Sequence, residues 1–104
     1  MVTSVHKLGN RVVLKFNEDI VDMRSGEDLK STLMELYASG EKEVVLDFGS
    51  IHLINGHGIG KILMFYKRFR EIGGSISVAP LDGSIKEIFE TLMLDKLIPE
   101  VKVQ

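Results

Sequence analysis

Residues Val44 to Gly74 read VVLDFGSIHLINGHGIGKILMFYKRFREIGG, and this stretch decides the fold. Its first residues form an apolar, β-branched run, which predicts a buried strand over residues 44–48. A glycine-bearing turn, NGHG, follows at residues 55–58. A helix is predicted after the turn, because apolar residues then recur every three or four positions. Gly73 and Gly74 end this helix, since glycine adopts the left-handed cap conformation without steric cost.

The chain before this stretch predicts a hairpin and a helix. Two short apolar segments, residues 2–5 and 11–16, flank a turn with the sequence Leu-Gly-Asn and indicate paired strands. A helix is expected from Ser25, as its N-cap, through Ser39. Gly40 then ends it.

The chain after the stretch predicts a strand, a helix and a final strand. Residues 75–79 (SISVA) have strand character and are followed by Pro80. Asp82 or Ser84 can cap the next helix, and a closing edge strand is expected around Val101 and Val103. The resulting order is β-β-α-β-α-β-α-β, which predicts an α/β fold with a mixed, mostly parallel sheet in a single domain, residues 1–104.

Composition excludes several classes of function. The chain has 104 residues, a formal net charge of -2 and no cysteine. Lysine and arginine are scattered, so no nucleic-acid partner is expected. Without cysteine, disulfides and thiolate metal sites are impossible. No apolar run approaches the roughly 20 residues of a membrane span, so we expect no membrane partner and a cytoplasmic location.

The loop and turn before the central helix do not match known catalytic motifs. A phosphate-binding P-loop requires glycine at Asn55 and a hydroxyl at Ile62, and the dinucleotide fingerprint requires a small residue at Lys61. His52 and His57 share the loop, but a metal site needs a third converging ligand. We therefore predict a protein that is not an enzyme and that has no metal and no cofactor.

Met64 is an unusual residue on the central helix. At 100° per residue it is expected to point away from the buried face, among charged residues such as Lys61 and Arg68. Such a methionine is either an isolated apolar residue on the surface or part of a partner-binding surface. The sequence leaves both interpretations open.

These features together resemble a known family. The strand VVLDF, the loop, a turn where the family has the form Asp-Ser-Ser-Gly-Leu-Gly, the helix with Tyr66-Lys67-Arg68 at its centre and the Gly-Gly end look like a STAS domain. More narrowly, they resemble the bacterial anti-sigma factor antagonists. The resemblance covers nearly the whole chain. It implies a STAS-like mixed β-sheet with helices packed largely on one face, in agreement with the predicted order.

The resemblance also implies a partner-switching function. Such antagonists bind an anti-sigma factor, usually a serine kinase with an ATPase-type fold, and thereby free a sigma factor. The kinase phosphorylates a serine at the start of the central helix and ends the binding. This chain differs there, because that serine falls on His57, the neighbouring serine on Gly56 and the preceding aspartate on Asn55. A second family aspartate falls on Asp22.

We therefore expect an anti-sigma factor antagonist that serine phosphorylation at the usual site cannot switch off. Two alternatives remain open: a divergent STAS scaffold that binds a different partner, and a sensor of a small molecule or nucleotide. The expected partner-binding residues lie in the turn, on the exposed side of the central helix and in the loop before the first helix: Asp22, Asn55, Gly56, His57, Gly58, Lys61 and Met64.

Overall fold

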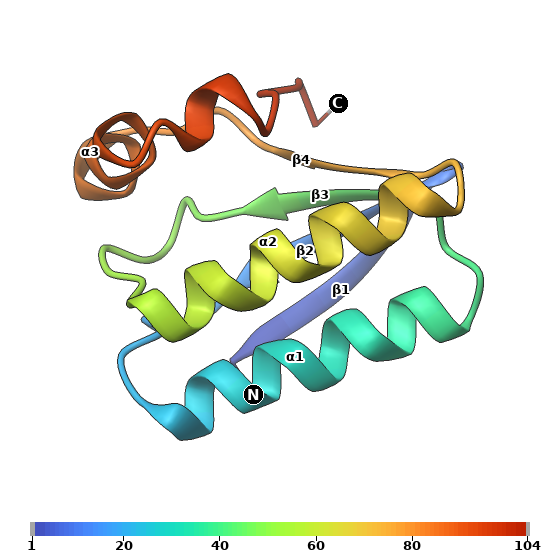
Figure 1. The fold of residues 1–104 in the computed structure, drawn as a ribbon, viewed down its shortest axis with the longest axis horizontal. Coiled ribbons are helices and arrows are strands. Elements are labelled where there is room, and N and C mark those ends of the chain that lie inside the picture. Colours follow the sequence, from blue (N-terminus) through green and yellow to red (C-terminus); the bar gives the residue numbers. More distant parts are fainter. Residues whose placement is uncertain (1, 104) are drawn as a thin grey trace.

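A four-stranded mixed sheet forms the centre of the protein. The computed structural model describes residues 2–103, and Figure 1 shows the fold. The strands are β1 (Thr3–Leu8), β2 (Arg11–Phe16), β3 (Glu43–Asp47) and β4 (Ser75–Val78), in the order β1-β2-β3-β4. β1 and β2 pair antiparallel, whereas β2 with β3 and β3 with β4 pair parallel. The predicted N-terminal hairpin and mixed sheet are confirmed.

Three helices connect and follow the strands. They are α1 (Met23–Ala38), α2 (Gly56–Glu71) and α3 (Gly83–Thr91), and a 3-10 turn, η1 (Leu94–Lys96), comes after α3. α1 and α2 lie side by side over one face of the sheet and run in the same direction (Figure 1). α3 lies near the end toward which β3 points (Figure 1). The expected packing of helices largely on one face is confirmed.

One apolar core lies between the sheet and the helices. Alternate residues of β2 and β3 face it, as the two-residue period of a strand requires. Phe65 and Phe69 of α2 are fully buried, and the ring of Phe89 from α3 lies 5.6 Å from the ring of Phe48. Burial of each such side chain stabilises the fold by about 1.5–3 kcal/mol. The strand residues in this core are Val12, Leu14, Phe16, Val44, Leu46, Ile76 and Val78.

The end of α2 confirms the role predicted for its two glycines. Gly73 has a φ of 80°, and its N–H donates to the carbonyl of Arg70 at 3.1 Å. The N–H of Gly74 donates to the carbonyl of Phe69 at 2.7 Å. This pair of bonds is the Schellman arrangement. A Cβ atom on Gly74 would also overlap the carbonyl oxygen of Lys42.

The prediction of a closing edge strand around Val101 and Val103 was wrong. This segment forms only one isolated bridge, between Val78 and Glu100. Pro99 has no N–H to contribute to a ladder, although its carbonyl accepts from the N–H of Val78 at 2.9 Å. The N–H of Val101 donates to the carbonyl of Val78 at 2.8 Å, and the pairing ends there. Val101 and Val103 pack against a second apolar cluster and so bury apolar surface. That cluster consists of Val13, Val45 and Ala79.

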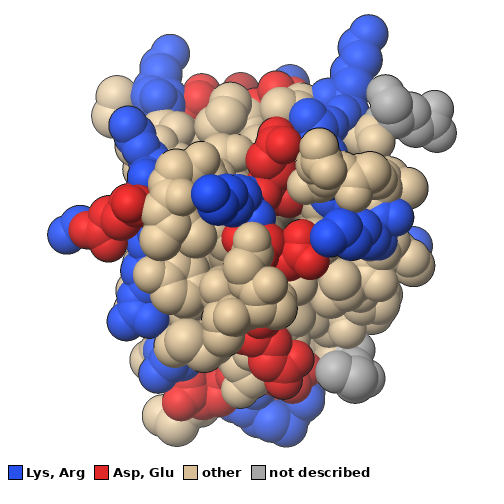
Figure 2. Space-filling model, turned by 90° about the vertical axis from the view of Figure 1, so that its right-hand side faces the viewer, with Lys and Arg blue, Asp and Glu red and all other residues tan. Residues whose placement is uncertain are grey.

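The end of the molecule opposite the starts of α1 and α2 carries charges of both signs. Figure 2 shows this end, where acidic side chains gather near the middle and basic side chains surround them. Lys7 of β1 and Glu41, after α1, form an ion pair at 2.9 Å. On this face, as formed by residues 2–103, no continuous basic surface of the kind that binds nucleic acid is present.

Candidate functional site

Two loops that are far apart in the sequence bring the starts of α1 and α2 together. Ile20, before α1, and Ile54, before α2, form a parallel bridge. The N–H of Ile20 donates to the carbonyl of Leu53 at 3.0 Å, and the N–H of Asn55 donates to the carbonyl of Ile20 at 2.7 Å. Asp19 adds a side-chain contact, since its Oδ1 accepts from the N–H of His52 at 2.8 Å. The two helix starts are therefore held as one unit.

Asn55 is the N-cap of α2, as the sequence predicted. Its Oδ1 accepts a hydrogen bond from the N–H of Gly58 at 3.0 Å. Gly58 is buried, and a Cβ atom there would lie 2.7 Å from Cγ2 of Ile20 and 2.8 Å from Cγ1 of Ile54. Glycine at this position thus permits the close approach of the two loops. Gly56, by contrast, is exposed, with open space where a Cβ atom would be.

His57 is exposed in the first turn of α2 and lies against α1. Its Cβ atom is 3.5 Å from the position of a Cβ atom built on Gly26. His57, Met23, Gly26, Glu27 and Lys61 line a surface cavity of about 220 Å³. The missing side chain at Gly26 leaves room for the imidazole beside α1. The cavity therefore joins residues of both helix starts.

Lys61 links α2 to α1 one turn further along. Its Nζ lies 3.6 Å from a carboxylate oxygen of Glu27, and both side chains retain contact with solvent. Exposed ion pairs of this kind stabilise a fold by about 0–1 kcal/mol. Both residues of the pair line the cavity.

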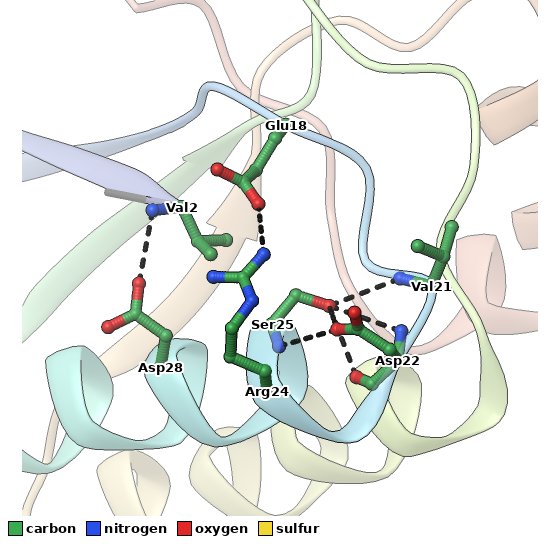
Figure 3. A network of polar contacts seen from close by, with 7 residues as sticks. All are labelled: Val2, Glu18, Val21, Asp22, Arg24, Ser25 and Asp28. Carbon is green, nitrogen blue, oxygen red and sulfur yellow. Dashed lines mark hydrogen bonds and ion pairs between the residues drawn. The ribbon is translucent and has the colours of Figure 1, made fainter.

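Asp22, rather than Ser25, is the N-cap of α1, which corrects the predicted start of this helix. The N–H of Ser25 donates to Oδ1 of Asp22 at 2.8 Å, and the Ser25 hydroxyl donates to the same oxygen at 2.7 Å (Figure 3). The hydroxyl in turn accepts from the N–H of Asp22 at 3.3 Å, which completes a capping box. Ser25 is thus the third helical residue and is fully buried.

The capping bonds also favour the ionised form of Asp22. Hydrogen bonds from the backbone N–H and the hydroxyl of Ser25 hold the pKa of the Asp22 carboxyl below its usual value. The carboxylate lies where the helix dipole favours a negative charge. Nearby, the Arg24 guanidinium donates to Glu18 at 2.6 Å, and this hydrogen bond raises the pKa of Arg24 (Figure 3).

The structure corrects the expected orientation of Met64. The side chain is partly buried and packs against the core instead of pointing away from it. Phe65, next in the chain, is fully buried. The helical-wheel estimate was wrong because α1 lies beside α2 and covers a face that a single amphipathic helix would leave exposed.

The helix junction presents polar side chains at the surface. Within residues 2–103, no group of three or more histidine, aspartate or glutamate side chains could hold a metal ion. No helix in this part of the chain is long and apolar enough to cross a membrane. What the site presents is an exposed imidazole, a carboxylate and a lysine around a shallow cavity.

Six of the residues predicted from the sequence lie at this helix junction, but part of its lining was missed. Asp22, Asn55, Gly56, His57, Gly58 and Lys61 all lie on or beside the two helix starts. The missed residues belong to α1, and a capping box read at Asp22 and Ser25 would have signalled that helix start. They are Met23, Gly26 and Glu27.

Comparisons with known proteins bear on the family and the fold of this chain. The family model described as "STAS domain" matches residues 3–104. BtrV of Bordetella bronchiseptica, named as an anti-sigma factor antagonist, is 29% identical over 73 residues, which is 70% of this chain. The match spans 63% of BtrV, less than two thirds of its length.

Solved structures show the same fold at low sequence identity. A Thermotoga maritima protein, also named as an anti-sigma factor antagonist, has a TM-score of 0.85 at 15% identity, over 94% of this chain and 84% of that one. The anti-sigma factor antagonist SpoIIAA, in its unphosphorylated form, has a TM-score of 0.69 at 12% identity, over 91% and 96%. Its phosphorylated form, from Bacillus, has a TM-score of 0.75 at 12% identity, over 97% and 92%.

Proposed function

Because this chain belongs to the STAS domain family, we propose that it is an anti-sigma factor antagonist, which binds an anti-sigma factor of the serine-kinase type. The relatives BtrV and SpoIIAA, both named as such antagonists, support the proposal. The protein acts by binding and not by catalysis, and complex formation releases the sigma factor that the anti-sigma factor holds.

The observation that carries the proposal is the position of His57. It is exposed in the first turn of α2 and adjoins the start of α1. The family resemblance assigns the phosphorylated serine to this position. SpoIIAA occurs in a phosphorylated and an unphosphorylated form, so a charge change is possible in that relative. In this chain the same position holds an imidazole.

This replacement removes the usual negative signal. A phosphoserine carries about -1.5 to -2 charges at neutral pH and three acceptor oxygens. At the start of a helix such a group would bind the free N–H groups and change the surface that a partner meets. Histidine cannot supply that negative charge. The protein is thus a binding module that a serine kinase does not switch off at this site.

The proposed contact surface is the junction of the two helix starts. Asp22, Gly56 and His57 are exposed there, whereas Asn55 and Lys61 are partly exposed. Gly58 is buried and contributes packing that holds the turn in place. Met64 is partly buried and packs against the core, so only its exposed part can contact a partner.

The experiment uses affinity capture from the source cell, followed by a phosphorylation assay. Proteins retained by the tagged chain are identified, and the retained kinase is then incubated with the chain and ATP. We expect an ATPase-fold anti-sigma factor among the retained proteins and no phosphate on residues 50–60. Stoichiometric phosphate in that segment would contradict the loss of the switch.

The matched control is His57→Ser, which restores a hydroxyl at the same position. We expect this variant to accept phosphate from the retained kinase and then to dissociate from it. If neither protein binds any ATPase-fold regulator, the antagonist function is wrong. Recovery of unrelated proteins would instead favour a divergent scaffold, and a rise in melting temperature with a nucleotide would favour a sensor.

A further inference from the structure

The three α-helices end in the same backbone conformation, but α3 ends on a different type of residue. The residue after each C-cap is left-handed: Gly40 after α1 has a φ of 86°, Gly73 after α2 a φ of 80° and Met93 after α3 a φ of 58°. The N–H of each donates to the carbonyl three residues earlier, at 3.2, 3.1 and 3.1 Å. Among residues 2–103, Met93 is the one residue other than glycine with a positive φ.

Methionine makes this helix end less stable than glycine would. In the left-handed conformation a Cβ atom lies too close to a carbonyl oxygen, and glycine avoids that contact. Burial does not compensate, because Met93 is 66% exposed and belongs to neither apolar cluster. The packing of the chain therefore does not account for a large apolar side chain at this position.

Two further exposed apolar side chains lie near Met93. Leu92, the C-cap of α3, directly precedes it and is 52% exposed, and Leu53, in the loop before α2, is 49% exposed. Leu53 and Leu92 line one surface cavity of about 470 Å³. Scattered exposed leucines are common, whereas several apolar side chains gathered at a hollow are typical of an interaction site. We name Leu53, Leu92 and Met93 the α3 patch.

The α3 patch adjoins the junction of the two helix starts. The Leu53 carbonyl accepts from the N–H of Ile20 at 3.0 Å, and the Leu53 N–H donates to Asp19 at 3.2 Å. The Ser84 hydroxyl of α3 donates to the carbonyl of His52, so the same loop also contacts α3. The start of α2 and α3 both lie at the end of the molecule toward which β3 points (Figure 1). A protein that covers the helix junction can therefore reach the patch.

The size of the α3 patch indicates what covers it. A stable pair of identical copies buries roughly 800 Å² on each partner, which three partly exposed side chains do not supply. The patch instead suits an extension of a larger interface. The helix junction presents an imidazole, a carboxylate and a lysine around its cavity, and the patch adds the apolar side chains that carry much of the affinity of protein interfaces.

We propose that the α3 patch contacts an apolar surface of the anti-sigma factor, which places one apolar side chain, such as leucine, methionine or phenylalanine, in the cavity between Leu53 and Leu92. The inference rests on the proposed function and extends its contact surface from the helix junction to α3. Met93 serves this contact at the expense of the stability of the helix end.

Substitution of Met93 tests stability and binding together. Met93→Gly should raise the melting temperature by about 4 °C or more, because the left-handed conformation no longer carries a Cβ atom. The same variant should bind the anti-sigma factor about tenfold or more weakly, because the apolar contact is lost. Met93→Leu keeps a large apolar side chain in the same conformation, and it should bind within about twofold of the wild type without a rise in melting temperature. Thermal unfolding and calorimetric titration measure the two effects.

The matched control is Gly40→Met at the end of α1. Gly40 is exposed, and a Cβ atom there meets no atom within 4 Å. This variant reproduces the strain of Met93 far from the helix starts, so it should lower the melting temperature and leave binding within about twofold of the wild type. A Met93→Gly variant that is no more stable than the wild type, or that binds equally well, would overturn the inference.

Oxidation of Met93 shows whether the contact is direct. Dilute hydrogen peroxide converts exposed methionine to the sulfoxide, which mass spectrometry quantifies for each residue. We expect the anti-sigma factor to slow oxidation of Met93 about tenfold, and serum albumin to leave the rate unchanged. An unchanged rate in the complex would contradict the contact. Sedimentation that reveals a dimer of the wild type but not of Met93→Gly would assign the patch to self-association and overturn the inference.

These outcomes separate the inference from the proposed function. An anti-sigma factor that binds the wild type and Met93→Gly equally contradicts the role of the α3 patch alone. A wild-type chain that binds no anti-sigma factor contradicts the proposed function, and the inference with it.

Discussion

The Cβ atom of His57 lies 3.5 Å from the point where a side chain on Gly26 would begin. This is an ordinary van der Waals distance, so a methyl group fits there but a longer side chain must enter the cavity beside the imidazole. The contact joins α1 to the position where relatives are expected to carry the phosphorylated serine. A substitution at Gly26 therefore changes the surroundings of His57 and leaves His57 itself in place.

Two substitutions at Gly26 should have different effects, one on the stability of the fold and the other on binding of the anti-sigma factor. Gly26→Ala should stabilise the protein by up to about 1 kcal/mol, because alanine is the better helix former. Gly26→Leu should weaken binding of the anti-sigma factor about tenfold or more, since its side chain occupies the cavity next to His57. Urea denaturation and calorimetric titration measure the two effects. Unchanged binding by Gly26→Leu would show that the partner does not use this cavity.

Substitution by alanine should change the stability of the protein in opposite directions at two glycines of α2. Gly58→Ala should destabilise the protein by about 1–3 kcal/mol, because its Cβ atom would overlap Ile20 and Ile54. Gly60→Ala meets no atom within 4 Å and should stabilise the helix by about 0.5–1 kcal/mol. Thermal unfolding of both variants tests this pair. A neutral Gly58→Ala would contradict the close approach of the two loops.

The N-cap of α1 should make stability depend on pH in the acidic range. Because the pKa of Asp22 in the folded state lies below its ordinary value of 3.8, ionised Asp22 stabilises the fold above that pH. This contribution is lost as the pH falls through the lowered value. Asp22→Ala should melt below the wild type at pH 7, and the gap should narrow in acid. Asp22→Asn, which keeps an acceptor but does not titrate, should remain near the wild type at pH 7.

Truncation of Phe65 to alanine should destabilise the protein much more than truncation of Met64. Phe65→Ala removes a fully buried ring and should cost about 3–5 kcal/mol of stability. Met64→Ala should cost less than about 2 kcal/mol, because that side chain is only partly buried. Equilibrium denaturation of the two variants gives the comparison. Equal losses would mean that Met64 belongs to the interior and cannot serve a partner surface.

Local signals predicted the elements and some of the site residues. The apolar run at residues 44–48, the Asn55 cap and the glycines after α2 depend on contacts within a few residues, and each was predicted. Errors occurred where distant segments compete with a local pattern. Val101 and Val103 have strand character, yet the segment pairs with β4 only at the Val78–Glu100 bridge, and both valines pack against the second apolar cluster.

The sequence by itself determined the order of the elements as far as α3 and the place of His57 in the first turn of α2, because periodicity and capping act over one or two turns. Only the tertiary structure decided what His57 faces. Met23, Gly26 and Glu27 stand opposite His57 and Lys61 because two parallel helices pack in a register of 34 residues. That register depends on the shared core and on the Ile20–Ile54 bridge, which no short stretch of sequence contains.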